Sequence, residues 1–171
     1  DMLDEDPERC VTQEGIDRAF ANKQRTSLYE FIYKNHRILL LSGKSTGRLE
    51  VTKMKGPAEE WLEVTKVERT LIDITVRPAY AGGVYQVLAA FEGAKDRVSM
   101  NTITALLRKF GYKYPYHQAI GFYMKKAGYP PKSIERLKKF DLDFDFYLDY
   151  GMSENNRSYD EEWRLFYPKG L

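Results

Sequence analysis

The chain has little cysteine and no long apolar run. Cys10 is the only cysteine among 171 residues, so the chain cannot form an internal disulfide. A lone thiol is typical of a reducing compartment, and we expect a cytoplasmic protein. No stretch of 18 apolar residues occurs, so the sequence predicts no membrane-spanning helix and no membrane partner. The N-terminal residues are acidic and lack the basic and apolar regions of a signal peptide.

Histidine is also scarce, which limits the chemistry that the sequence predicts. His36 and His117 are the only two histidines and stand 81 positions apart. This spacing gives neither a metal-binding set nor the local signature of a nucleophile with its histidine and acid. We therefore expect no metal, no cofactor and no catalytic residues, and we predict that the protein is not an enzyme.

One short motif brings a phosphate-binding loop to mind but lacks its main features. Residues 43–47 read Gly-Lys-Ser-Thr-Gly. A phosphate loop requires a glycine at position 38, which is Ile38 here, and a helix directly after the motif. The sequence predicts no helix at that point, so we expect a polar hairpin loop.

The spacing of apolar residues predicts an α+β fold. A helix capped by Thr12 is expected over 13–21. β-Forming residues over 28–64 predict a small, mostly antiparallel sheet, and helical spacing downstream predicts a segment of five helices. Alternation over 140–146 and the apolar residues of 162–167 predict C-terminal strands. The parts are β-rich over about 12–64, helical over about 65–139 and stranded over about 140–168, within one domain of residues 1–171.

Residues 65–76 form the best-defined helix in the sequence. Thr65 and Glu68 have the spacing of a capping box, in which the hydroxyl and the carboxylate accept hydrogen bonds from N–H groups of the first turn. Arg69 and Asp73 are four positions apart and are expected to pair on one face. The sequence therefore predicts a helix start at the point where the β-rich part ends.

Charge is strongly separated along the second half of the chain. Between residues 99 and 139 there are nine bases and a single acid, and between 140 and 162 there are eight acids and one base. The nine bases are Arg108, Lys109, Lys113, Lys125, Lys126, Lys132, Arg136, Lys138 and Lys139. With the aromatic residues between them, they predict either a surface for nucleic acid or another acidic partner, or a solvated helical face balanced by the acidic tail.

Three acids in the tail allow an enzymatic alternative. Asp141, Asp143 and Asp145 alternate with apolar residues, so they are expected on one face of a strand, where they could gather a divalent cation. A metal-dependent nuclease is therefore an alternative function. The spacing places no further acids or lysine around a common centre, and a solvent-facing polar stripe is favoured.

Four segments together resemble the AbiEi family of antitoxins. TKVERTLID at 65–73 and VRPAYAGGV at 76–84 carry most of the resemblance, and TQEGIDRAF at 12–20 and GKSTGRL at 43–49 extend it. The motif residues are Thr65, Glu68, Arg69, Asp73, Arg77, Gly82 and Gly83, to which we assign structural roles. The resemblance provides no catalytic residues.

The resemblance implies a type IV toxin–antitoxin system that acts in abortive infection, a form of phage defence. Members typically carry an N-terminal winged helix-turn-helix, which represses their operon, and a C-terminal domain that counters a nucleotidyltransferase-like toxin. No helix-turn-helix is predicted before residue 12, so we expect the antitoxin domain alone. The implied partner is the cognate toxin, met directly or through a shared nucleic-acid target. The main alternative is a nucleic-acid-binding transcriptional regulator that uses residues 99–139.

Overall fold

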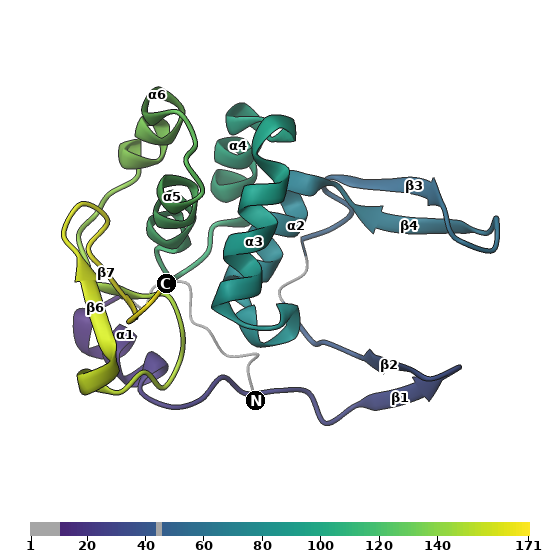
Figure 1. The fold of residues 1–171 in the computed structure, drawn as a ribbon, viewed down its shortest axis with the longest axis horizontal. Coiled ribbons are helices and arrows are strands. Elements are labelled where there is room, and N and C mark those ends of the chain that lie inside the picture. The colour runs from purple at the N-terminus through teal and green to yellow at the C-terminus, as the bar shows by residue number, and fades with distance from the viewer. Residues whose placement is uncertain (1–10, 44–45) are drawn as a thin grey trace.

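The computed structural model describes residues 11–43 and 46–171 as a helical body from which two β-hairpins project (Figure 1). The acidic N-terminal residues 1–10, and Lys44 and Ser45 of the polar loop, lie outside the described residues. The α-helices are α1 (Gln13–Phe20), α2 (Val67–Val76), α3 (Val84–Ala94), α4 (Met100–Phe110), α5 (Tyr116–Lys126) and α6 (Pro131–Ile134), and the 3-10 helices are η1 (Pro78–Ala81), η2 (Lys95–Arg97), η3 (Glu135–Lys139) and η4 (Glu154–Asn156). The strands are β1 (Glu30–Tyr33), β2 (His36–Leu39), β3 (Val51–Lys55), β4 (Trp61–Thr65), β5 (Phe146–Tyr147), β6 (Arg157–Asp160) and β7 (Leu165–Pro168). The predicted α+β fold is confirmed.

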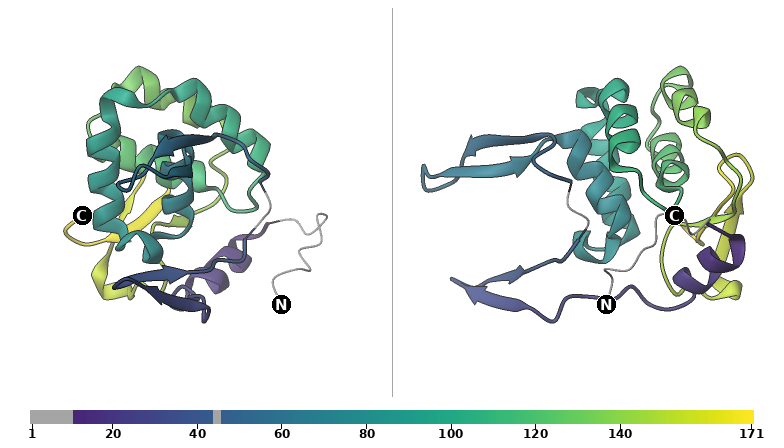
Figure 2. Two further views of the ribbon diagram at one scale, coloured as in Figure 1. Left: turned by 90° about the vertical axis from the view of Figure 1, so that its right-hand side faces the viewer. Right: turned by 180° about the vertical axis from the view of Figure 1, so that it is seen from behind.

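The first four strands form two separate hairpins rather than one sheet. β1 pairs with β2, and β3 pairs with β4, both antiparallel. Lys34 and Asn35 make the first turn, with left-handed φ values of 45° and 64° that fit a tight two-residue hairpin. The chain between β2 and β3 runs back to the helical body, which keeps the hairpins apart (Figure 2). Within the predicted sheet region, residues 47–50 form a turn, and β3 begins at Val51.

Several helix boundaries in the body follow from local chemistry, and the cap predicted at Thr12 is confirmed. The Thr12 hydroxyl accepts a hydrogen bond from the Gly15 N–H at 3.2 Å and caps α1. The Ser99 hydroxyl accepts one from the Thr102 N–H at 3.3 Å and caps α4. Gly111 ends α4 with a left-handed φ of 50°, which glycine adopts without strain. Helix ends in this part of the chain are therefore set by single residues.

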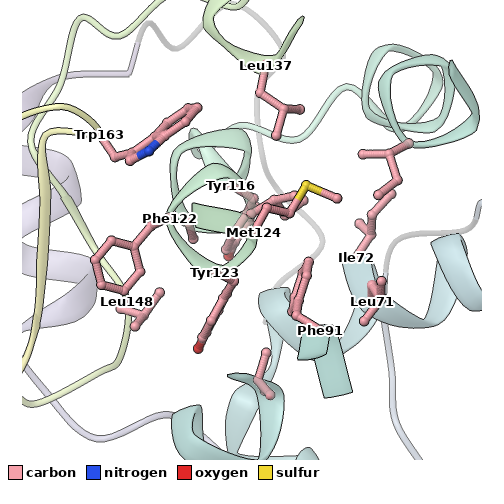
Figure 3. Close-up of a cluster of buried hydrophobic side chains, with 14 of the residues drawn as sticks. Leu71, Ile72, Phe91, Tyr116, Phe122, Tyr123, Met124, Leu137, Leu148 and Trp163 are labelled. Carbon is pink, nitrogen blue, oxygen red and sulfur yellow. The ribbon is translucent and has the colours of Figure 1, made fainter. Parts of the chain in front are cut away.

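Helix α5 lies at the centre of the hydrophobic core. All residues from 118 to 124 are buried, because other helices cover one side and the C-terminal strands cover the other (Figure 3). Tyr123 stacks on Phe91, with ring centroids 5.1 Å apart. On another side of the helix, a Cβ added at Gly121 would come within 2.3 Å of the Trp163 ring. Because helix α5 is buried all round, it joins the other helices of the body to the C-terminal strands in one unit.

The C-terminal strands form a small mixed sheet with α1 beside it. β7 lies between β5 and β6, parallel to β5 and antiparallel to β6. The Gln13 side chain donates to the Asp145 carbonyl at 2.9 Å and accepts from the Asp145 N–H at 2.8 Å. These two bonds tie α1 to the sheet, so the body includes residues from both ends of the described chain.

The strand predicted over 140–146 is wrong, because regular pairing begins only at Phe146. Side chains satisfy the carbonyl groups of the preceding loop instead of a neighbouring strand. Arg164 Nη1 donates to the Leu142 carbonyl at 3.1 Å, and Gln118 Nε2 donates to the Phe144 carbonyl at 2.9 Å. The alternation of apolar and acidic residues therefore belongs to a loop that packs its aromatic residues inward.

Candidate binding surface

The motif residues of α2 anchor the second hairpin to the body. Arg69 Nε lies 2.8 Å from Asp73 Oδ2, which confirms the predicted pair. Its other nitrogens donate to the Leu49 carbonyl at 2.9 Å and to the Thr46 hydroxyl at 2.6 Å. The guanidinium also lies 4.9 Å from the centre of the Phe110 ring in α4. One arginine thus joins the approach to β3, helix α2 and helix α4.

The residues after α2 anchor the first hairpin in the same way. Arg77 Nη2 donates to the Ser42 carbonyl at 2.7 Å, just after β2. The Tyr80 hydroxyl accepts from the Ser27 N–H at 2.6 Å, just before β1. The segment that resembles AbiEi antitoxins is therefore the common root of both hairpins. Sequence reasoning missed Tyr80, whose tertiary partner is 53 residues away.

The capping box predicted for Thr65 and Glu68 is wrong. Thr65 still belongs to β4, and Lys66 is the N-cap of α2 without a side-chain cap bond. The Thr65 hydroxyl lies 2.7 Å from the Thr70 hydroxyl instead. The Glu68 carboxylate accepts a hydrogen bond at 2.9 Å from the N–H of Ser99, and Ser99 is the N-cap residue of α4. Glu68 is buried and caps a neighbouring helix rather than its own.

Gly82 and Gly83 serve the sharp connection between η1 and α3. Their φ values are 84° and 90°, in the region that side chains disfavour. Gly83 is the N-cap of α3 with ψ of 176°, a combination open essentially to glycine alone. This supports the structural role assigned to both residues.

The structure does not gather the nine predicted bases into one surface. Lys125 lies 2.9 Å from Asp160 and 2.7 Å from Glu162, and Lys138 lies 3.0 Å from Glu162. These two lysines lower the pKa of the Glu162 carboxyl. The acidic tail thus folds against part of the basic segment, as expected for a helical face balanced by the tail.

Two more of the bases face groups of the chain itself. Lys126 Nζ donates to the Leu171 carbonyl at 2.8 Å, and Arg136 donates to the Asn101 side chain. Lys109 lies on α4 and Lys132 lies on α6. Neither of them lines the groove to which the other three bases, Arg108, Lys113 and Lys139, contribute.

Three of the bases, Arg108, Lys113 and Lys139, line one groove with a volume of about 510 Å³. Aromatic residues share its walls, including Tyr112, Tyr114, His117 and Phe140, and Asp141 and Asp143 also line it and reduce its positive charge. We call this feature the basic groove. Lysine and arginine side chains next to partly exposed aromatic rings can contact both the phosphates and the nucleobases of a nucleic acid.

His117 is held in place at the edge of the basic groove. Its Nε2 lies 2.9 Å from the Asp141 carbonyl, and its ring stacks on Phe140 with centroids 5.2 Å apart. Burial lowers the pKa of the imidazole, against a smaller opposing effect of the Asp141 carbonyl. The ring is therefore neutral at pH 7 and adds an aromatic surface rather than a charge.

The three acids proposed as metal ligands do not form a site. Asp145 accepts from the Tyr159 hydroxyl at 2.6 Å and from Arg164 Nε at 3.0 Å. Within residues 11–43 and 46–171, no three His, Cys, Asp or Glu side chains are grouped so as to hold a metal ion. Because the expected strand is a loop, the shared face that supported a nuclease is missing.

Comparisons with known proteins give no assignment. No family model, curated protein or solved structure matches the chain. The AbiEi resemblance therefore stays a prediction. None of the helices in the described ranges combines the length and the apolar character that crossing a bilayer requires.

Proposed function

We propose that the chain is a non-enzymatic antitoxin domain that opposes a nucleotidyltransferase-like toxin in a bacterial cytoplasm. The family assignment rests on the resemblance of residues 65–84 to AbiEi antitoxins. The basic groove carries the proposal for how the domain acts, because opposing a toxin at a nucleic-acid target requires a surface for that target. Arg108, Lys113 and Lys139 would contact phosphates, and Tyr112 would contact a base or ribose.

Charge supports the groove over the rest of the basic segment. Lys125 and Lys138 already face carboxylates at 2.7–3.0 Å, so binding a phosphate there would first break those pairs. Arg108 faces the Phe140 ring at 5.6 Å, a contact that leaves its N–H groups available for an anion. The three bases of the groove form no such ion pair, while Asp141 and Asp143 in the same lining leave it with a net charge of +1 (three bases minus two acids).

Co-expression with a nucleotidyltransferase-like toxin encoded by a neighbouring gene tests the proposal. The unmodified chain should restore growth, and a variant with Arg108→Gln, Lys113→Gln and Lys139→Gln should not. A matched control with Lys23→Gln, Lys53→Gln and Lys132→Gln loses the same charge outside the groove and should restore growth. Failure of the unmodified chain to restore growth contradicts the antitoxin proposal.

A nucleic-acid-binding regulator is the second candidate, and the basic groove favours it too. Affinity for duplex DNA should fall steeply with salt, because phosphate contacts release counterions. Removing three contacts should reduce the slope of log K against log salt by about 2.7. Binding of DNA without growth rescue would select the regulator. Growth rescue by a protein that binds neither DNA nor RNA at low salt would rule out the groove as the acting surface.

A further inference from the structure

Two acids that line the basic groove, Asp141 and Asp143, have carboxylates that bond to no other group in the described part of the chain. Both side chains are exposed. Asp145, the next acid of the same loop, differs, because it accepts from the Tyr159 hydroxyl at 2.6 Å and from Arg164 Nε at 3.0 Å. The groove therefore presents two hydrogen-bond acceptors that residues 11–43 and 46–171 leave open.

The loop that carries these two acids is held in place through its backbone. The Asp141 carbonyl lies 2.9 Å from His117 Nε2, and the Phe144 carbonyl accepts from Gln118 Nε2 at 2.9 Å. His117 and Gln118 both belong to α5, the helix at the centre of the core. The backbone is thus fixed on both sides of Asp143. Acceptors on a supported loop keep their positions before a ligand arrives, which favours recognition.

The lining of the groove matches the three parts of a nucleotide. Arg108, Lys113 and Lys139 carry the positive charge that phosphates require. The rings of Tyr112 and Phe140 offer surfaces for a planar base. The open carboxylates can accept hydrogen bonds from donors on the edge of that base. The volume of about 510 Å³ lies within the usual range of ligand pockets, about 300–1,000 Å³.

Other occupants match only part of this lining. A divalent cation would meet three bases, and the described residues contain no group of His, Cys, Asp or Glu side chains able to hold one. An acidic peptide would satisfy the bases but would bring further carboxylates toward Asp141 and Asp143. A nucleotide brings phosphate to the bases and N–H donors to the acids, so it is complementary to both.

We infer that the basic groove takes an unpaired nucleobase whose exocyclic amino group donates to Asp141 or Asp143, and that it thereby selects cytosine over uracil. Cytosine has an N4 amino donor where uracil has an O4 acceptor. A uracil carbonyl facing a carboxylate would bring two acceptors together with no proton between them. Pairing in a duplex occupies the amino group, so the groove reads single strands. This inference rests on the proposed function, since it names the base that the groove prefers.

Fluorescence anisotropy with labelled RNA octamers tests the selection. At neutral pH and low salt, the whole chain should bind an octamer of cytidine at least about tenfold more tightly than one of uridine, as a hydrogen bond to a charged acceptor implies. An octamer of 2-pyrimidinone riboside, in which hydrogen replaces the amino group, should bind within about threefold of the uridine octamer.

Replacing both acids by amides separates base recognition from charge. In the double variant Asp141→Asn and Asp143→Asn, each amide can accept from cytosine or donate to uracil, so the preference should fall below about threefold. The uridine octamer should bind more tightly than before, because the groove loses two negative charges. Both positions are exposed, so thermal unfolding should not change.

A matched control changes the same charge away from the groove. Glu92→Gln with Glu161→Gln removes two exposed acids that do not line it. This control should keep the full preference for cytidine. A preference that persists in the Asp141→Asn and Asp143→Asn variant would overturn the assignment of the two acids.

The outcomes also separate this inference from the proposed function. Equal affinity of the unmodified chain for the cytidine and uridine octamers would overturn the selection while the groove still served as a nucleic-acid surface. Absence of binding to either octamer at low salt would overturn the selection together with the role of the groove.

Discussion

The two tryptophans mark two regions of the molecule with opposite packing. Trp163 is fully buried against α5, whereas Trp61, at the outer end of β4, is 65% exposed. In the body, apolar residues meet one another from α1, the helices and the C-terminal strands. In the hairpins, they mostly face outward. The body is therefore stabilised by its own apolar surface, while the hairpins leave much of theirs exposed.

The largest expected effect uses this contrast between the tryptophans. Trp163→Ala should lower the free energy of unfolding by about 3–5 kcal/mol, because it leaves a cavity beside Gly121. Trp61→Ala should change it by less than about 0.5 kcal/mol, because its ring contacts little besides Lys55. Urea unfolding of both variants measures the difference. Equal costs would mean that the hairpins are packed as tightly as the body.

The next effect tests the contact between α2 and α4. Glu68→Ala should lower the free energy of unfolding by about 1–3 kcal/mol, because the Ser99 N–H loses its buried acceptor. Glu92→Ala, on an exposed position of α3, is the matched control and should cost less than about 0.5 kcal/mol. Unchanged stability of Glu68→Ala would show that the Ser99 N–H does not depend on this carboxylate.

A third change weakens the attachment of the second hairpin. Arg69→Gln removes the fork that holds the Leu49 carbonyl and the Thr46 hydroxyl, and should cost about 1–2 kcal/mol. Amide hydrogen exchange should rise most in β3 and β4 and little in α5. Uniform acceleration throughout the chain would show that hairpin and body open together. Arg48→Gln is the control, because it removes an exposed ion pair with Glu63 and none of the hydrogen bonds that Arg69 makes.

The smallest expected effect concerns the ion pairs of the acidic tail. Glu162→Gln should cost less than about 1 kcal/mol at pH 7, because the carboxylate and Lys125 are both 42% exposed. The pKa of Glu162 is lower in the folded chain than in the unfolded one, first through Lys125 and then through Lys138. Its contribution is therefore present above the unfolded pKa and is lost as the pH falls through the folded pKa. Melting temperatures of variant and parent should converge in acid and in 1 M salt; a difference that persists in both would contradict this account.

Sequence patterns predicted elements well where one residue sets a boundary. Thr12, Ser99 and Gly111 define helix ends through local bonds or backbone geometry, so their roles could be read from the sequence. Glu68 has the spacing of a local cap, but β4 extends through Thr65, so Thr65 does not begin the helix. The Glu68 carboxylate instead accepts a hydrogen bond from the Ser99 N–H at the start of α4. That outcome depends on tertiary packing, which spacing alone does not contain.

The candidate surface was predictable in composition but not in arrangement. The excess of bases in 99–139 is plain in the sequence, yet only the fold shows that Lys125 and Lys138 meet the acidic tail. The remaining bases of the groove come together because the loop after α4 lies next to residues 139–143. The β-forming residues of 28–64 indicated strands, but the sequence could not show that no described part of the same chain covers their apolar side chains.

The two hydrogen bonds between Gln13 and Asp145 also have a consequence for folding during translation. The two residues are 132 positions apart, and Phe20 of α1 packs on Phe146 and Tyr150 with ring centroids 5.0 and 4.3 Å away. On the ribosome, α1 emerges before these partners, and its apolar side stays uncovered until residues 146–150 have been translated. A nascent chain halted before Asp145 should therefore leave α1 open to protease, and release of the finished chain should protect it.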